Sequence, residues 1–203
     1  VLIATHSRYV VDLNRPPDGA DLYPGQDTTG VVPVDTFHKE PLYLKRDEPT
    51  ETEIQDRVER YWKPYHAKLN EAISATKERH GHVLLWDAHS IFSVLPRFFE
   101  GTLPDLNLGT ASGQSCGSGI GEALLATVDS RYSAVLDGRF KGGYITRHYG
   151  DPPNGVHAVQ LELSEATYMD ETLPYRFRED LAGKLRPQLK RLMECFVQPG
   201  QPR

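Results

Sequence analysis

The chain has 203 residues, of which 25% are charged and 38% are hydrophobic, and it carries a formal net charge of -5. This length and composition are typical of one globular domain with a substantial core, so we expect residues 1–203 to form a single domain. The negative charge gives no basic face for a nucleic-acid backbone, and no segment approaches the roughly 20 apolar residues that span a bilayer. We therefore expect neither nucleic acid nor a membrane as a partner.

The first predicted element is a strand over residues 7–13, where β-branched and aromatic residues alternate with polar ones. It runs directly into Asn14 and Arg15 and ends at Pro16. A guanidinium group presents a rigid set of charged donors that matches a carboxylate in two places, so this strand end favours an anionic substrate. The alternative is an edge strand whose arginine forms a surface salt bridge.

A long irregular stretch follows as far as Pro49, and its length indicates a functional loop. Thr50 and Glu53 then form a capping-box pattern, and apolar residues at spacings of three and four predict a helix that reaches Ile73. Pro64 should bend this helix, because proline has no N–H group to donate.

The second half of the chain alternates between predicted strands and helices. The apolar run at 83–86 is typical of a strand that is buried on both faces. Further strands are expected at 134–136, 144–146 and 156–163, and helices at 122–129 and 178–197. Interleaved strands and helices predict an α/β fold with helices on the faces of the sheet and function in the loops beyond the strand ends.

The two cysteines, Cys116 and Cys195, show no metal-binding spacing, and nothing that resembles a secretory signal precedes them. We therefore expect reduced thiols and a cytoplasmic protein.

Asp87 and His89 follow the predicted strand at 83–86 and form the best metal-ligand pattern in the chain. A neutral imidazole is a common zinc ligand, and a nearby carboxylate can orient it. A catalytic zinc ion normally takes three protein ligands and a water molecule, so His89 alone does not define a site. The alternative is a hydrogen-bonded structural histidine.

Glu162 lies among the apolar residues of the strand predicted at 156–163. Burial would raise its pKa, which is the direction that a general base near neutrality needs, whereas on a solvated strand face it would have no such role. Arg147 comes after the glycine-rich stretch 138–143 and could place a second cation near the site. The plainer interpretation of Arg147 is a charged hairpin tip.

Six strings in this order share one resemblance: residues 7–15, 22–26, 86–90, 103–110, 138–150 and 156–162. Together they resemble the N-formylglutamate amidohydrolase (N-formylglutamate deformylase) family, which is in turn similar to the zinc carboxypeptidase and aspartoacylase group. The resemblance implies a three-layer α/β/α fold with a mixed, mostly parallel sheet, like that of the zinc carboxypeptidases.

The family's activity is the hydrolysis of N-formyl-L-glutamate to formate and L-glutamate, a step of histidine breakdown, so the implied partner is a small-molecule substrate. The implied cofactor is Zn²⁺, or another divalent metal, with His89 as one ligand. The family's other metal ligands lie upstream of the arginine strand. Because this sequence begins at Val1 without a methionine, we expect its N-terminal part, with those ligands, to be missing.

The resemblance also assigns roles to the other polar residues. Glu162 would be the base that activates water, and Arg8 would polarise the formyl oxygen and stabilise the oxyanion. Asn14, Arg15 and Arg147 would hold the two carboxylates of the substrate.

Two alternatives remain open. One is an amidohydrolase of another N-acyl acidic amino acid, similar to aspartoacylase. The other is a truncated, non-catalytic domain that binds acidic metabolites through Arg8, Arg15 and Arg147. The sequence does not indicate an oligomeric state.

Overall fold

The computed structural model describes residues 1–198, and its helices and strands begin only at residue 51. Before that point the chain is irregular, with one isolated β-bridge between Asp35 and Pro41. The elements are α1 (Glu51–Arg57), the π-helical turn η1 (Val58–Trp62), α2 (Lys63–His80), β1 (Val83–Ile91), β2 (Leu106–Gly109), α3 (Ile120–Ala126), β3 (Ala134–Leu136), α4 (Tyr144–Tyr149), the short 3₁₀ turns η2 (Pro152–Asn154) and η3 (Glu165–Thr167) on either side of β4 (Val156–Ser164), and α5 (Glu179–Val197).

The four strands form one mixed sheet in the order β1-β4-β2-β3. The pairs β1–β4 and β2–β3 are parallel, and β2 runs antiparallel to β4. The predicted α/β fold with a mixed sheet is therefore confirmed. The register between β1 and β4 places Asp87 opposite Gln160 and His89 opposite Glu162, which determines the geometry of the site described below.

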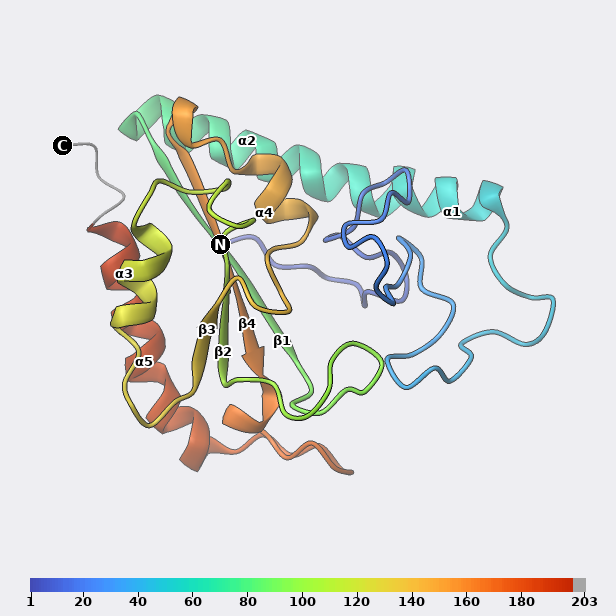
Figure 1. Cartoon of the computed structure of the whole chain (residues 1–203). Coiled ribbons are helices and arrows are strands. Elements are labelled where there is room, and N and C mark those ends of the chain that lie inside the picture. Colours follow the sequence, from blue (N-terminus) through green and yellow to red (C-terminus); the bar gives the residue numbers. More distant parts are fainter. Residues whose placement is uncertain (199–203) are drawn as a thin grey trace.

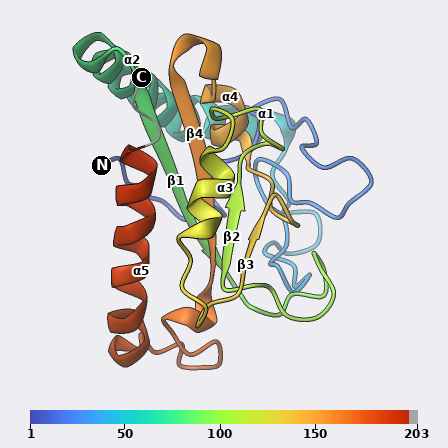
Figure 2. The same cartoon turned by 60° about the vertical axis from the view of Figure 1, so that its left-hand side comes forward.

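Helices cover both faces of the sheet (Figures 1 and 2). The largest core cluster, which includes Leu124 of α3 and Leu192 of α5, lies on one face. A second cluster on the other face joins Ile73 of α2 to Ile145 of α4. In Figure 1 the sheet is seen nearly edge-on, with α3 and α5 to its left and most of the irregular segment 1–50 to its right. Within residues 1–198, none of the helices is both long and apolar enough to cross a membrane.

The strand predicted at 7–13 is wrong, because this segment forms turns. Val10 donates its N–H to the carbonyl of Ser7 at 2.9 Å, and the carboxylate of Asp12 accepts the N–H of Asn14 at 3.0 Å. Such local bonds from an aspartate side chain compete with a strand ladder.

The strand predicted at 144–146 is also wrong, since these residues begin α4, and the predictions missed β2. Tyr144, Ile145 and Thr146 favour a strand locally, but the tertiary structure overrides that preference. Asn14 accepts the N–H of Tyr144 at its carbonyl (3.2 Å) and the N–H of Ile145 at its side-chain Oδ1 (2.8 Å). A residue distant in sequence therefore satisfies the first donors of this helix.

The helix predicted from Thr50 is confirmed and extends to His80. The hydroxyl of Thr50 accepts the N–H of Glu53 at 3.3 Å, as the capping-box pattern predicts. Pro64 lies in the first turn of α2, directly after the π-helical turn η1. The regular α-helical hydrogen bonds are already interrupted at η1, so the N–H group that proline lacks falls at this interruption.

Three consecutive carbonyl groups, those of residues 13–15, are each held by a donor from another element. His66 Nε2 bonds the first at 2.9 Å, the Tyr144 N–H bonds the second at 3.2 Å, and Trp62 Nε1 bonds the third at 3.0 Å. Because a carbonyl can only accept, His66 carries its proton on Nε2, and its Nδ1 accepts the hydroxyl of Tyr149 at 2.9 Å. These bonds fix the irregular segment that carries Asn14 and Arg15.

We predict that His66 makes the folded state sensitive to acid. Burial is the main cause that lowers the pKa of His66 from 6.5 to about 4, so the folded protein keeps this ring neutral where an unfolded chain protonates it. The unfolded state therefore binds more protons between these two values, and stability should fall as the pH drops from 6.5 towards about 4.

Thermal unfolding of the wild type and of His66→Gln at neutral and acidic pH tests this expectation. The acid-induced drop in Tm should be smaller for His66→Gln than for the wild type, while His80→Gln, at an exposed position, should behave like the wild type. Equal drops for the wild type and His66→Gln would contradict the prediction.

A second prediction concerns the close approach of Gly143 to Asn14. A Cβ atom at Gly143 would lie 2.4 Å from Asn14 Nδ2, although the φ of -85° permits alanine. We expect Gly143→Ala to lower the free energy of unfolding in urea by about 1–3 kcal/mol, because the clash displaces Asn14. The control is Gly183→Ala in α5, where no atom lies within 4 Å. That substitution should stabilise the protein by roughly 0.5–1 kcal/mol, and an equal effect of both changes would argue against the clash.

Candidate active site

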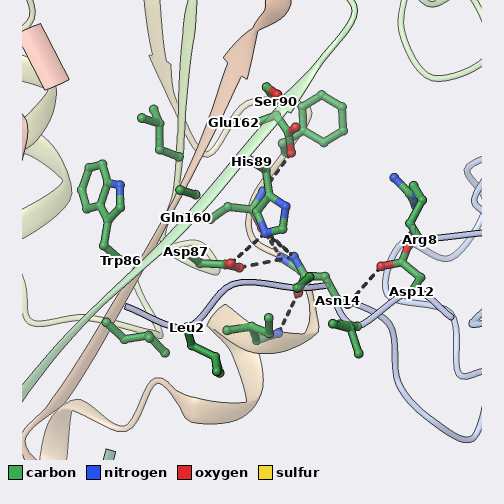
Figure 3. Close-up of a pocket in the computed structure, with 18 of the residues that line it drawn as sticks. Leu2, Arg8, Asp12, Asn14, Trp86, Asp87, His89, Ser90, Gln160 and Glu162 are labelled. Atoms are coloured by element: carbon green, nitrogen blue, oxygen red, sulfur yellow. Dashed lines mark hydrogen bonds and ion pairs between the residues drawn. The ribbon is translucent and has the colours of Figure 1, made fainter. Parts of the chain in front are cut away.

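Four polar side chains form a two-by-two array on one face of two adjacent strands (Figure 3). β1 contributes Asp87 and His89, and β4 contributes Gln160 and Glu162 at the paired register positions. Asp87, Gln160 and Glu162 are buried. Because side chains alternate between the faces of a strand, the apolar neighbours of Gln160 and Glu162 point to the opposite face, into the largest core cluster.

The side chain of Asn14 lies over this array (Figure 3). Its Oδ1 accepts the N–H of Ile145, which fixes the orientation of the amide and turns Nδ2 towards the array. Nδ2 donates to Asp87 Oδ2 at 3.3 Å and to Gln160 Oε1 at 3.4 Å; it also lies 3.0 Å from His89 Nε2, which bonds Asp87 instead. The amide of Asn14 is thus engaged by protein groups, and its predicted contact with a substrate carboxylate stays a prediction.

His89 is held as a cation by Asp87. The Nε2 atom of His89 lies 2.7 Å from Asp87 Oδ1. Burial by itself lowers the pKa of the imidazole, but the charge and hydrogen bond of Asp87, with the charges of Glu162 and Asp12, together raise the pKa to about 9. The ring is therefore an imidazolium at neutral pH.

Glu162 has the properties predicted for a general base. Burial raises the pKa of its carboxyl group to about 7, and the positive charges of His89, Arg8 and Arg15 oppose that rise without cancelling it. Near neutrality its protonated and ionised forms are both populated, so the group can take up and release a proton. The predicted burial of Glu162 is confirmed.

A cavity of about 1020 Å³ runs along the array and is also lined by Arg8, Arg15 and Arg139. The guanidinium of Arg8 contacts the Asp12 carboxylate, bonds Thr29 Oγ1 at 3.1 Å and lies 4.4 Å from the centre of the Phe37 ring. The structure thus brings five of the predicted residues to one cavity: Arg8, Asn14, Arg15, His89 and Glu162.

The sequence predictions missed Arg139, which lies three residues after the strand at 134–136, in the glycine-rich stretch. Arg139 lines the cavity, whereas the predicted residue Arg147 does not. Both guanidinium groups lie over the ring of Tyr23, at 5.3 Å for Arg139 and 5.1 Å for Arg147. Arg139 and Arg147 lie in the same string of the family resemblance, residues 138–150. That string indicated an arginine near the site, but it did not indicate which of the two faces the cavity.

Arg15 and Arg139 carry charges that no carboxylate among residues 1–198 neutralises. Within residues 1–198, neither forms an ion pair with a carboxylate; Arg15 bonds the Thr29 carbonyl at 3.1 Å and Arg139 the Phe98 carbonyl at 2.6 Å. Burial and the charge of Arg15 lower the pKa of Arg139. Two cations that repel each other in one cavity favour an anionic ligand.

The described residues do not by themselves form a zinc site. Within residues 1–198, no group of three His, Cys, Asp or Glu side chains is placed to hold a metal ion. A catalytic zinc ion normally takes three protein ligands, so the residues present do not fit the implied metal. The prediction that His89 binds Zn²⁺ or another divalent metal continues to rest on the resemblance alone.

Comparisons with known proteins give a consistent result. The sequence profile of the N-formylglutamate amidohydrolase family matches residues 1–169. Two proteins named N-formylglutamate deformylase, from Pseudomonas putida and Pseudomonas aeruginosa, are each 47% identical over 205 residues, which cover 100% of this chain and 76% of each relative.

Two crystal structures share the fold. An N-formylglutamate amidohydrolase from Ralstonia eutropha matches with a TM-score of 0.73 at 24% identity, over 95% of this chain and 72% of that one. A gene product from Agrobacterium tumefaciens matches with a TM-score of 0.68 at 18% identity, over 95% of this chain and 68% of that one. With the family profile matched over most of its length, this chain belongs to the N-formylglutamate amidohydrolase family.

Proposed function

We propose that this chain hydrolyses N-formyl-L-glutamate to formate and L-glutamate. Family membership and the relatives named N-formylglutamate deformylase support the proposal. The observation that carries it is the content of one cavity: a buried carboxyl group with a pKa of about 7, that of Glu162, and two guanidinium groups without a carboxylate partner among the described residues, those of Arg15 and Arg139. A base and two cations suit the hydrolysis of an amide that carries two carboxylates.

Glu162 is the base in this proposal. Its ionised carboxylate takes a proton from water as the water oxygen attacks the formyl carbon. The same proton goes to the amide nitrogen as the C–N bond breaks, which releases glutamate and formic acid, and the latter ionises to formate. The raised pKa suits both transfers, because the group must first accept the proton and then donate it.

Arg8 and His89 supply positive charge near the reacting carbonyl. Arg8 lines the cavity, and its charge acts on Glu162, so we assign its guanidinium to the formyl oxygen, where negative charge develops. His89 lies opposite Glu162 in the register of β1 and β4 and, as long as no metal is bound to it, adds the charge of its imidazolium.

Arg15 and Arg139 hold the two carboxylates of the substrate in this proposal. Two anionic groups would relieve the repulsion between the two guanidinium groups. Arg147 would act indirectly, by packing against Tyr23, and Asn14 by holding the array.

Four further expectations belong to the proposal and are supported by the resemblance alone: a Zn²⁺ or other divalent cofactor, zinc-carboxypeptidase-like layering, a place in histidine catabolism, and a cytoplasmic location. No step above passes through a metal.

The direct test is the release of formate from N-formyl-L-glutamate by the purified chain, with and without added zinc. N-acetyl-L-glutamate serves as the comparison for the acyl group, because faster hydrolysis of the acetyl compound would favour an aspartoacylase-like substrate. No formate above background in either condition would overturn the proposal.

We predict that Glu162→Gln lowers kcat by roughly 100- to 10,000-fold, the usual contribution of a positioned acid or base. In the wild type, kcat/KM should rise with pH through about 7, since only the ionised carboxylate accepts a proton. The control Glu122→Gln changes an exposed carboxylate of α3 and should leave both parameters unchanged. A Glu162→Gln variant with wild-type kcat would exclude Glu162 as the base.

Arg139→Gln should raise KM by at least about tenfold with a smaller change in kcat, because it removes a contact made by the bound substrate as well as by the transition state. Arg147→Gln is the matched control, since Arg147 packs on the same tyrosine but does not line the cavity. Steady-state kinetics on N-formyl-L-glutamate decide between the two arginines, and a larger rise in KM for Arg147→Gln would reverse their assignment.

A further inference from the structure

Gln160 is buried in the array, with 3% of its surface exposed, and the chemistry proposed above does not use it. It lies on β4, which is flanked by strands on both sides, two residues before Glu162. Its Oε1 accepts the N–H of Gly143 at 2.8 Å, and its Nε2 lies 3.4 Å from Glu162 Oε2 (Figure 3). A buried amide is costly unless its groups are bonded, and here both ends have partners.

The neighbours of Gln160 determine which way its amide points. A backbone N–H can only donate, so the atom that faces Gly143 must be the amide oxygen. Asn14 places a second donor, its Nδ2, 3.4 Å from the same oxygen. The NH₂ group of Gln160 is therefore directed at the carboxyl group of Glu162.

A donor at one oxygen of a carboxylate has two consequences. It restricts rotation of the group, and it leaves the other oxygen, Oε1, which has no hydrogen bond within the described part of the chain, as the site for a proton. Buried polar neighbours that hold a reacting group in this way affect kcat more than KM, because small displacements of the reacting atoms greatly lower the reaction rate.

We propose that Gln160 is a positioning residue for Glu162: the Gly143 N–H fixes the amide, and the amide fixes the carboxylate so that Oε1 faces the attacking water. The inference rests on the proposed function, because it assumes that Glu162 is the base.

The first test is Gln160→Met, which keeps a side chain of similar length and removes both the donor and the acceptor. It should lower kcat by roughly 10- to 100-fold and change KM by less than about twofold. The matched control is Gln188→Met, because Gln188 is also buried and bonded, to Asp129 N–H and the Thr127 carbonyl, but lies in α5. Its kcat should stay at the wild-type value, and a kcat loss as large as that of Gln160→Met would overturn the inference.

A double-mutant cycle separates positioning from general support of the fold. If Gln160 acts through Glu162, Gln160→Met should cost no further kcat in a Glu162→Gln background, whereas multiplicative losses would indicate a structural role and refute the proposal. Wild-type kcat in Glu162→Gln would instead refute the proposed base. A loss in Glu162→Gln together with wild-type kcat in Gln160→Met would refute only the positioning role.

A third measurement does not depend on turnover. The side-chain NH₂ signals of Gln160 in a ¹⁵N NMR spectrum can be identified by their loss in Gln160→Met. They should shift in Glu162→Gln and stay in place in Glu122→Gln. Unchanged chemical shifts of these signals in Glu162→Gln would overturn the proposed contact.

Discussion

The contact between Asn14 and the array of Asp87, His89, Gln160 and Glu162 joins the two parts of this structure. One part is a mixed sheet with helices on both faces, and the other is the irregular segment 1–50. The side chain of Asn14 reaches the array, while its Oδ1 and backbone carbonyl receive the first donors of α4. Together with the bonds from His66 and Trp62, this contact brings the arginines of the segment and the polar residues of the sheet to the same cavity.

The electrostatics of the array depend on its burial. Away from water, charges act strongly on one another, and the environment separates two groups that would otherwise titrate closer together. The pKa of His89 rises to about 9 because neighbouring carboxylates stabilise its positive charge. The pKa of Glu162 rises to about 7 because burial disfavours its negative charge. Near neutrality one group is a stable cation and the other can exchange a proton.

The sequence was sufficient for elements whose signal is local. The capped helix from Thr50 and the apolar strand from Val83 were predictable because caps and apolar runs lie within a few residues. The segment 7–13 and α4 were not, since Asn14 and the helix donors meet only in the folded chain. Most of the site residues were predictable because they lie in local motifs. Arg139 was not, because only the folded structure shows that it lines the cavity.

The anchoring of residues 13–15 by separate hydrogen bonds, at their three carbonyl groups and at the Asn14 side chain, has a consequence for motion. A strand inside a sheet is released only when its whole ladder breaks, but a segment held by a few separate bonds can detach while the sheet stays intact. Arg15 belongs to that segment and Arg139 does not. A dicarboxylate bound to both arginines would link the segment to the rest of the protein. Amide hydrogen exchange in the segment would therefore slow when such a ligand binds.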